Sequence, residues 1–259
     1  MVKVGEIEIV PLSDGELHIP AQALLNRDLP PEFTDDEGLM AVNFGGYLVR
    51  LGNRVVVVDT GIGGGALPEL GIGSFPERLR AAGVAPEDVD TVVLTHLHFD
   101  HVGWSKLFTN ARFHAHAIDW AYWVTDATPE TGPGREDFGA IPAPERVAPL
   151  AGRVTLHDGE RTEIVPGLTL RHAPGHTPGH CIVEVGDEIV LLADAAHNPA
   201  QLLTGGWTSV TDVDPELAAR TRESLAAELA GSGKLIAMTH HPRLGRLERG
   251  GWAYAPSIE

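Results

Sequence analysis

Four side chains that can bind metal lie within six residues of one another, in a stretch that reads His96-x-His98-x-Asp100-His101. The chain contains 13 histidines and one cysteine, so any metal chemistry would use imidazole and carboxylate ligands rather than thiolates. In an extended loop, His96 and His98 can converge on one ion while Asp100 and His101 face a second ion beside it. The motif therefore predicts a metal centre with room for two ions.

Three further candidate ligands stand where later predicted strands end: His176, Asp194 and His240. Each is weak evidence alone, because a single histidine at a strand end is more often structural, but together with the motif they predict one shared centre. Asp194 has two carboxylate oxygens and can bridge two ions. Asp59, also at a predicted strand end, can accept the second ring N–H of a ligand such as His101 or His240, or can cap a turn.

The elements that must hold these residues alternate between strands and helices. The sequence predicts strands at 46–51, 54–59, 89–94, around Phe113, and at 154–156, 163–165, 168–172, 181–185, 188–193 and 234–238, the last strand. It predicts helices at 75–82, 118–125 and 215–229, the last capped by Asp214. The glycine-rich stretch 62–73 lacks a phosphate-binding pattern, and we interpret it as a flexible loop. This order favours a single layered α/β domain over residues 1–259, with two sheets packed between helices.

The overall composition excludes several classes of protein. The 259 residues are 43% hydrophobic and 21% charged, which argues against disorder and against a coiled coil. A net charge of −17 repels phosphate backbones, so we expect no nucleic-acid partner. No stretch approaches the roughly 20 apolar residues that span a bilayer, and the first residues lack a secretory pattern. We therefore expect no membrane partner and a cytoplasmic location, and the lone Cys181 cannot form an internal disulfide.

The order of the motif and the three later ligands resembles the metallo-β-lactamase-fold hydrolases. The resemblance covers nearly the whole chain, through Asp59-Thr60-Gly61, Ala82-Gly83 with Val89-Asp90, the Pro-Gly-His-Thr-Pro-Gly-His segment at 174–180, and Thr239-His240. Further segments look like the branch of methyl-parathion-hydrolase-like and quorum-quenching-lactonase-like enzymes: Asp100-His101-Val102-Gly103-Trp104, residues 194–199, Arg220-Thr221-Arg222 and Gly245-Arg246-Leu247. The fold implied by this resemblance is the αββα four-layer sandwich.

The same resemblance implies a role for each candidate. His96, His98 and His176 would bind a first ion, Asp100, His101 and His240 a second, and Asp194 would bridge the two. Two zinc ions are the expected cofactors, with Mn, Fe or Co compatible with the same ligand types. A hydroxide held between the ions would attack a carbonyl or phosphoryl centre, and Asp100 would orient it or pass its proton to the leaving group. The expected activity is hydrolysis of small lactones, carboxylic esters or phosphotriesters.

Other residues are candidates for the wall of a pocket for this small-molecule substrate. They are Phe99, Trp104, His197 and Trp207, together with Leu202 and Leu203, and core packing is the alternative for each. We assign Trp120 and Trp123 to the core.

Several histidines and one long segment complete the interpretation. His180 is a candidate neighbour of the ligands, His241 is assigned to packing, and structural roles are assigned to His18, His114, His116, His157 and His172. Residues 128–149 are interpreted as a lid or a long surface connection. This segment and the residues before Gly45 are also candidates for a homodimer interface.

Two alternative functions share the fold. A mononuclear-iron sulfur dioxygenase-like oxidoreductase would use His96, His98 and His176 alone, and the second set of ligands argues against it. A β-lactamase would act outside the cytoplasm, and no export signal is evident. The acidic charge disfavours a ribonuclease, no basic cluster suits the glutathione substrates of glyoxalase II, and a flavodiiron site would have Glu in place of His98. A non-catalytic binding protein would have lost ligands, whereas all seven positions are present.

Overall fold

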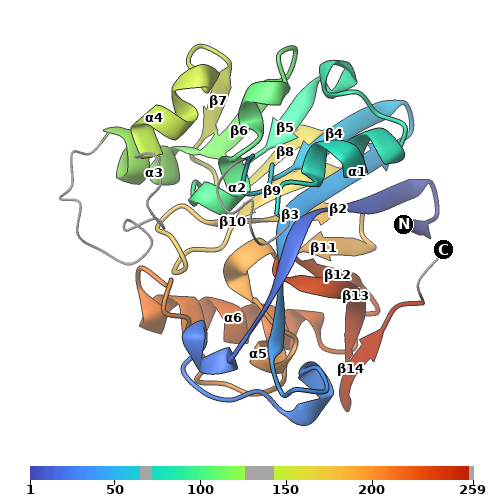
Figure 1. Cartoon of the computed structure of the whole chain (residues 1–259), viewed down its shortest axis with the longest axis vertical. Helices are drawn as coiled ribbons and strands as arrows, with labels where there is room; N and C mark the ends of the chain where they lie inside the picture. Colours follow the sequence, from blue (N-terminus) through green and yellow to red (C-terminus); the bar gives the residue numbers. More distant parts are fainter. Residues whose placement is uncertain (65–71, 126–142, 257–259) are drawn as a thin grey trace.

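Two packed β-sheets form the centre of the protein in the computed structural model, which describes residues 1–64, 72–125 and 143–256 (Figure 1). Within these residues each sheet has seven strands, in the orders β1-β2-β3-β4-β5-β6-β7 and β14-β13-β12-β11-β10-β9-β8. The first sheet comprises β1 (Val2–Val4), β2 (Ile7–Ile19), β3 (Met40–Leu51), β4 (Arg54–Val58), β5 (Thr91–Val93), β6 (Arg112–His116) and β7 (Val154–His157). The second comprises β8 (Arg161–Val165), β9 (Leu168–His172), β10 (Cys181–Val185), β11 (Ile189–Leu191), β12 (Leu235–Met238), β13 (His241–Glu248) and β14 (Gly251–Tyr254). Strands β4 to β7 run parallel, as do β11 and β12, and the other neighbours are antiparallel.

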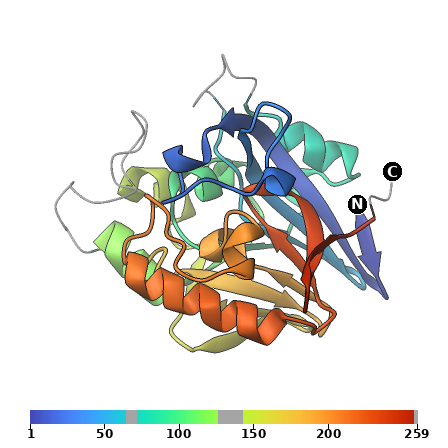
Figure 2. The ribbon, with the colours of Figure 1, turned by 90° about the horizontal axis from the view of Figure 1, so that it is seen from below.

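Helices cover the outer face of each sheet. Over the first sheet lie α1 (Phe75–Ala81), α2 (Phe99–Val102), α3 (Ala117–Trp120), the π-helical turn Ala121–Thr125, and α4 (Ala143–Val147). Over the second lie α5 (Ala200–Leu203) and α6 (Pro215–Leu229), and Figure 2 shows α6 running along the outer face of that sheet. Short 3-10 turns occur at Ala21–Ala23, Pro31–Phe33, Pro86–Asp88, Ser105–Leu107, Ala148–Leu150 and Ala193–Ala195. The layers are those of the predicted αββα sandwich, which is confirmed.

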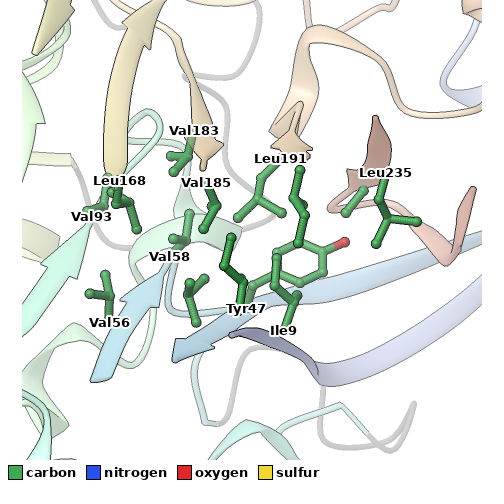
Figure 3. Packing of buried hydrophobic residues seen from close by; sticks show 14 of the residues in the cluster. Ile9, Tyr47, Val56, Val58, Val93, Leu168, Val183, Val185, Leu191 and Leu235 are labelled. Atoms are coloured by element: carbon green, nitrogen blue, oxygen red, sulfur yellow. The ribbon is translucent and has the colours of Figure 1, made fainter. Parts of the chain in front are cut away.

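The alternation of strand side chains explains how one sequence fills both interfaces. In β4, Val56 and Val58 pack between the sheets, whereas Val57 packs against the helices of the first sheet. In β10, Val183 faces the first sheet and Ile182 belongs to the cluster beneath α6. Successive strand residues point to opposite faces, so a strand buried on both faces is apolar throughout. Figure 3 shows the inter-sheet cluster, in which side chains from both sheets interdigitate.

The predicted strands all form, and α6 begins as expected, with the Asp214 carboxylate accepting the Leu217 N–H at 2.9 Å. One region was not predicted and two expectations were wrong. Strands β1, β2 and the first half of β3 were not predicted, because the alternation in β2 breaks at an irregularity between Ser13 and Gly15. Strand β12 is not the last, since β13 and β14 follow it. The predicted helix at 118–125 is a four-residue α-helix followed by a π-helical turn.

Two predictions lie largely outside the described residues. They concern the glycine-rich loop, of which residues 65–71 are not described, and the lid, of which residues 128–142 are not described. The remainder of the second segment forms α4 and a 3-10 turn. In the part of the chain that the structure describes, no helix is long and apolar enough to cross a membrane.

Candidate metal centre

The structure brings all seven predicted ligands together, from both sheets. On the side of the first sheet, His96 and His98 lie in the loop after β5, and Asp100 and His101 lie in α2. The second sheet contributes three residues from loops at its strand ends: His176 between β9 and β10, Asp194 after β11, and His240 between β12 and β13. Each of the seven is at most 7% exposed. Buried polar groups need partners, so the contacts among these side chains decide what the site can do.

A first cluster is formed by three imidazoles and one carboxylate. His98 Nδ1 lies 3.0 Å from His96 Nε2 and 3.0 Å from His176 Nε2, and Asp194 Oδ2 lies 3.3 Å from His176 Nε2. A neutral imidazole has a single N–H. His96 directs Nδ1 at the Thr95 hydroxyl, and His176 directs Nδ1 at Asp212 Oδ1. With those nitrogens as donors, both Nε2 atoms present lone pairs to the same point, as metal ligands do.

A second cluster lies on the other side of Asp194. His240 Nε2 is 3.0 Å from Asp194 Oδ2 and 3.5 Å from Asp100 Oδ2. His101 Nε2 is 3.3 Å from Asp194 Oδ1 and 3.8 Å from Asp100 Oδ2. Both rings use Nδ1 elsewhere, His101 on Asp59 and His240 on the Asn43 carbonyl. Their Nε2 lone pairs therefore face carboxylates, an arrangement that a cation between them would stabilise.

The spacing of these donors suits metal ions. Zinc bonds of about 2.0 to 2.1 Å in tetrahedral geometry place neighbouring donors roughly 3.3 Å apart. The separations given above, and the 4.0 Å between His96 Nε2 and Asp194 Oδ2, lie around or somewhat above this value. Asp194 Oδ1 and His101 Nε2 are buried without a hydrogen-bond partner among the described residues, which a bound ion would supply. Two clusters joined at one carboxylate form a candidate site for two metal ions.

The electrostatics of the two clusters differ. Burial, reinforced by the neighbouring imidazoles, lowers the pKa of His96 and of His98 well below 6.5 and keeps both rings in the neutral form that binds metal. Burial also opposes charge on His101 and His240, but Asp194 and the other nearby carboxylates outweigh it and raise the pKa of both. The carboxylates therefore make the second cluster more negative than the first, and it attracts positive charge more strongly.

Asp59 positions His101, as one of its two sequence interpretations expected. Its Oδ2 accepts His101 Nδ1–H at 2.8 Å and the Thr95 hydroxyl at 2.7 Å, while Oδ1 accepts the Thr95 N–H at 2.8 Å. His240, the other candidate partner of Asp59, instead directs its ring to the Asn43 carbonyl at 2.8 Å. Asp59 has a φ of +57°, a conformation costly for a residue other than glycine, so the surrounding structure must hold it.

Asp212 plays the same part for His176, and sequence reasoning missed it. Its Oδ1 lies 3.0 Å from His176 Nδ1, and its Oδ2 accepts the Ser209 N–H at 2.8 Å. Arg222, 1% exposed, approaches the same carboxylate at 3.6 Å and donates to the Ala195 and Trp207 carbonyls. Asp212 lies in a loop without a recognisable pattern, and only the tertiary structure brings it to His176.

Two further buried residues hold the ligand loops together. Asp119, also missed, accepts the Leu97 N–H at 2.8 Å and the Gly179 N–H at 3.1 Å, so it ties the motif loop to the segment that carries His176. Burial raises the pKa of Asp119 to about 6. The structure places His180 beside the ligands: its Nδ1 lies 3.0 Å from the Ala173 carbonyl and its Nε2 accepts the Asp194 N–H at 3.2 Å.

The predicted pocket residues fall into two groups. His197 adjoins the centre, with its Nε2 3.4 Å from Asp194 Oδ2, whereas Phe99 lies within the motif on the chain and Trp104 packs against the core beneath the helices of the first sheet. The Trp104 indole donates to Asp14 Oδ2 at 2.9 Å. Trp207 packs instead with Leu25, Phe33 and Met40, donates to Thr204, and lies under the Arg27 guanidinium.

The two leucines that precede Trp207 in the sequence have different surroundings. Leu202 packs in the cluster beneath α6, and Leu203 is 36% exposed. Apolar residues after Asp194 can serve a pocket or a core equally well, and here Leu202 and Trp207 are part of the core.

The remaining aromatic and histidine predictions have mixed outcomes. Trp123 is in the core, as predicted, but it also contacts a ligand, with its ring 5.1 Å from that of His98. His241 stacks on Tyr254. The histidines given structural roles form a surface ion pair at His18 and two stacked ring pairs, His114 with His157 and His116 with His172.

Known proteins match both the sequence and the fold. The family model of the metallo-beta-lactamase superfamily matches residues 46–240. N-acyl homoserine lactonase AiiB of Agrobacterium fabrum (strain C58 / ATCC 33970) is 30% identical over 191 residues, which cover 64% of this chain and 67% of that enzyme. N-acyl homoserine lactonase AiiA of Bacillus thuringiensis subsp. kurstaki is 26% identical over 193 residues, covering 66% and 70%.

Two solved structures share the whole architecture. Hydrolase AbOPH of the beta lactamase superfamily has a TM-score of 0.79 at 23% identity, covering 100% of this chain and 97% of that one. AidC, a dizinc quorum-quenching lactonase solved with a product, has a TM-score of 0.76 at 19% identity with the same coverage. These structures establish the shared fold, and the family model establishes descent over most of the chain. The chain belongs to the metallo-beta-lactamase superfamily, as the resemblance implied.

Proposed function

We propose that this metal-dependent hydrolase opens lactone rings and that N-acyl homoserine lactones are its substrate class. The observation that carries the proposal is the pair of clusters joined at Asp194, in which imidazole lone pairs converge on each other and on two carboxylates. The names of the lactonase relatives support lactones over other carbonyl substrates. The reaction adds water to the ring ester and yields the open-chain hydroxy acid.

We assign the ligands as the two clusters arrange them. His96, His98 and His176 hold one ion, Asp100, His101 and His240 hold the other, and Asp194 reaches both. When bound, the ions would supply a hydroxide at neutral pH, held between them, and would polarise the substrate oxygen. Asp59, Asp212 and the Asn43 carbonyl fix the tautomers of three of these rings, so each presents Nε2 to the centre.

We assign the proton transfer to Asp100. Its Oδ2 lies 3.5 Å from His240 Nε2 and 3.8 Å from His101 Nε2, at the edge of the second cluster, and the residue is 7% exposed. A carboxylate in this position can take the proton that water gives up and pass it to the ring oxygen as the ring C–O bond breaks. Without that proton, the leaving group would depart as a high-energy alkoxide.

We propose zinc as the native metal, because the site is rich in imidazole and closed by carboxylates. Mn, Fe and Co fit the same ligand types, so elemental analysis of protein purified without added metal is the test. Two equivalents of zinc support the proposal, and one equivalent of iron would favour the mononuclear alternative. The cytoplasmic location and the homodimer remain predictions from the sequence.

The activity is tested by comparing substrate classes in one assay. We would measure kcat/KM of zinc-loaded protein in a pH-stat on N-acyl homoserine lactones, aryl esters, phosphotriesters and β-lactams. The proposal expects lactones to be the preferred class, with His98→Ala and Asp194→Ala each lowering turnover by orders of magnitude while the fold is retained. Protein that binds two equivalents of zinc and hydrolyses no lactone would refute it, and a preference for esters or phosphotriesters would redirect it.

A further inference from the structure

The peptide group between Pro178 and Gly179 is held from both sides, a short way along the chain from the ligand His176. Its carbonyl accepts the His172 Nε2–H at 2.9 Å, and its N–H donates to Asp119 Oδ1 at 3.1 Å. A Cβ added to Gly179 would lie 2.2 Å from the Asp119 backbone nitrogen, so this peptide lies directly against the first turn of α3. The chain beside His176 is therefore fixed through both polar groups of one peptide.

His116 joins the two side chains that hold this peptide. Its ring stacks on that of His172, with centroids 4.3 Å apart and planes 5° apart. It is also the N-cap of α3, the helix that carries Asp119, because its Nδ1 accepts the Ile118 N–H at 3.3 Å. Burial and the neighbouring His172 lower the pKa of His116, so the ring stays neutral and Nδ1 can accept. Three residues thus form a closed clamp around the peptide: His116, His172 and Asp119.

The clamp also reaches the other two imidazoles of the first cluster. Asp119 Oδ2 accepts the Leu97 N–H at 2.8 Å, and Leu97 lies between His96 and His98 in the chain. Asp119 is 1% exposed and His116 is 2% exposed, so water cannot take over these contacts. One buried carboxylate therefore connects the two segments that carry all the histidines of the first cluster.

We infer that the clamp positions His176 against His96 and His98 and thereby sets the affinity of the first ion. This inference rests on the ligand sets of the proposed function. A group that directly orients a metal ligand typically contributes about 10- to 100-fold in metal affinity, and the clamp acts one contact further out, so we expect about 10-fold. The rings of the second cluster are oriented by a different carboxylate and by a backbone carbonyl, so the second ion should bind as before.

The test is a zinc titration of the whole chain against a chromogenic chelator, which resolves two binding steps. Asp212→Asn identifies the step of the first ion, since Asp212 contacts His176 Nδ1 at 3.0 Å. We expect His116→Leu, which removes the acceptor that caps α3, to weaken this step by about 10-fold and to leave the other step unchanged. His116→Asn should restore most of the affinity, because asparagine is a preferred N-cap residue.

His114→Leu is the matched control. His114 lies on the same strand as His116 and also stacks on a histidine, but the cap of α3 is His116. This control should change neither step. A double-mutant cycle then tests the route: if His116 acts through Asp119, His116→Leu should add little to the effect of Asp119→Asn, which loses one of two acceptor oxygens. His172→Leu removes the donor to the Pro178 carbonyl and should weaken the same step.

Each other outcome overturns the inference. Equal weakening of both steps, a His116→Asn variant that binds no better than His116→Leu, or loss of the fold in the His116 and His172 variants would assign the clamp to the fold as a whole. Additive effects of His116→Leu and Asp119→Asn would show that the two residues act separately. Wild-type protein that binds fewer than two zinc ions refutes the proposed ligand sets first, whereas two resolved steps that no clamp variant changes refute this inference alone.

Discussion

Asp59→Asn should weaken one of the two metal sites and leave the other intact. All three contacts of this carboxylate are with donors: His101 Nδ1 at 2.8 Å, the Thr95 hydroxyl at 2.7 Å and the Thr95 N–H at 2.8 Å. An amide has one oxygen, so in either orientation its NH₂ group meets at least one of these donors. If it meets His101, the ring proton moves to Nε2 and the lone pair that faces the second cluster is lost.

The size of the effect follows from that contact. Loss of a partner that orients a metal-binding histidine typically lowers metal affinity about 10- to 100-fold. This corresponds to roughly 1.4 to 2.7 kcal/mol at one site. Because the Asp59 carboxylate is 1% exposed, water cannot replace it, and we expect the upper part of this range.

Asp212→Asn is the matched control, because Asp212 contacts His176 Nδ1 of the first cluster at 3.0 Å. Metal-free protein is titrated with zinc against a chromogenic chelator, which resolves two binding steps. Each single variant should weaken one step, and the double variant should weaken both. If either single substitution lowers both steps equally, the two carboxylates act through the fold as a whole. If neither step changes, the contacts at Nδ1 do not govern metal binding, and the reasoning is wrong.

Three further substitutions test the framework around the site. Asp14→Ala leaves four donors without an acceptor: the N–H groups of Ile62, Gly63 and Phe75 and the Trp104 indole. It should lower the free energy of unfolding in urea by about 3 to 5 kcal/mol. A decrease of less than about 1 kcal/mol would contradict this. Gly103→Ala places a Cβ 2.1 Å from the Ile62 carbonyl carbon and should cost about 2 to 3 kcal/mol by the same measurement, whereas Gly250→Ala, with open space around it, should be nearly neutral. Burial lowers the pKa of His241 to about 4, so the unfolded chain binds its proton first as the pH falls, and the stability present above pH 6.5 is lost toward pH 4. His241→Phe, which can keep the stacking on Tyr254, should remove about 2.5 kcal/mol of that acid sensitivity in unfolding titrations at pH 7.5 and 4.5, and equal pH dependence in both proteins would show that His241 is not the cause.

The ligands could be predicted from sequence because they follow local rules. The four residues of the motif are close in the chain. Asp194 and His240 each follow a strand with an apolar run, and His176 follows a strand in which apolar and polar residues alternate. The ends of neighbouring strands meet at one edge of a sheet, so residues far apart in sequence arrive at the same place. Asp59 was assignable to either of two histidines, and only the three-dimensional structure distinguishes His101 from His240.

The residues that support the ligands could not be predicted, because their roles depend on tertiary contacts. Asp14 lies in β2, a strand of 13 residues. Pro11, Ser13 and Gly15 interrupt its pattern of apolar residues, so the sequence did not predict this strand. Asp212 lies in a loop and Asp119 in the first turn of α3, positions where an aspartate is common and carries no signal of its own. Trp207 was predicted as a pocket residue but packs in the core. A large apolar side chain near a site suits a pocket wall as well as a core, and the sequence does not distinguish the two.

The metal centre lies where the two sheets meet, and it buries charged and polar side chains from both of them at a cost to folding. His240 Nε2 lies 3.0 Å from an Asp194 oxygen, and both groups are buried. The backbone is strained at the same place, with positive φ at Asp59 and at Ala193, the residue before Asp194. The apolar contacts within and around the sheets must therefore stabilise a site that destabilises the fold. Ions that bind only this folded arrangement would add to its stability according to their concentration and affinity, which couples the function of the site to the persistence of the fold.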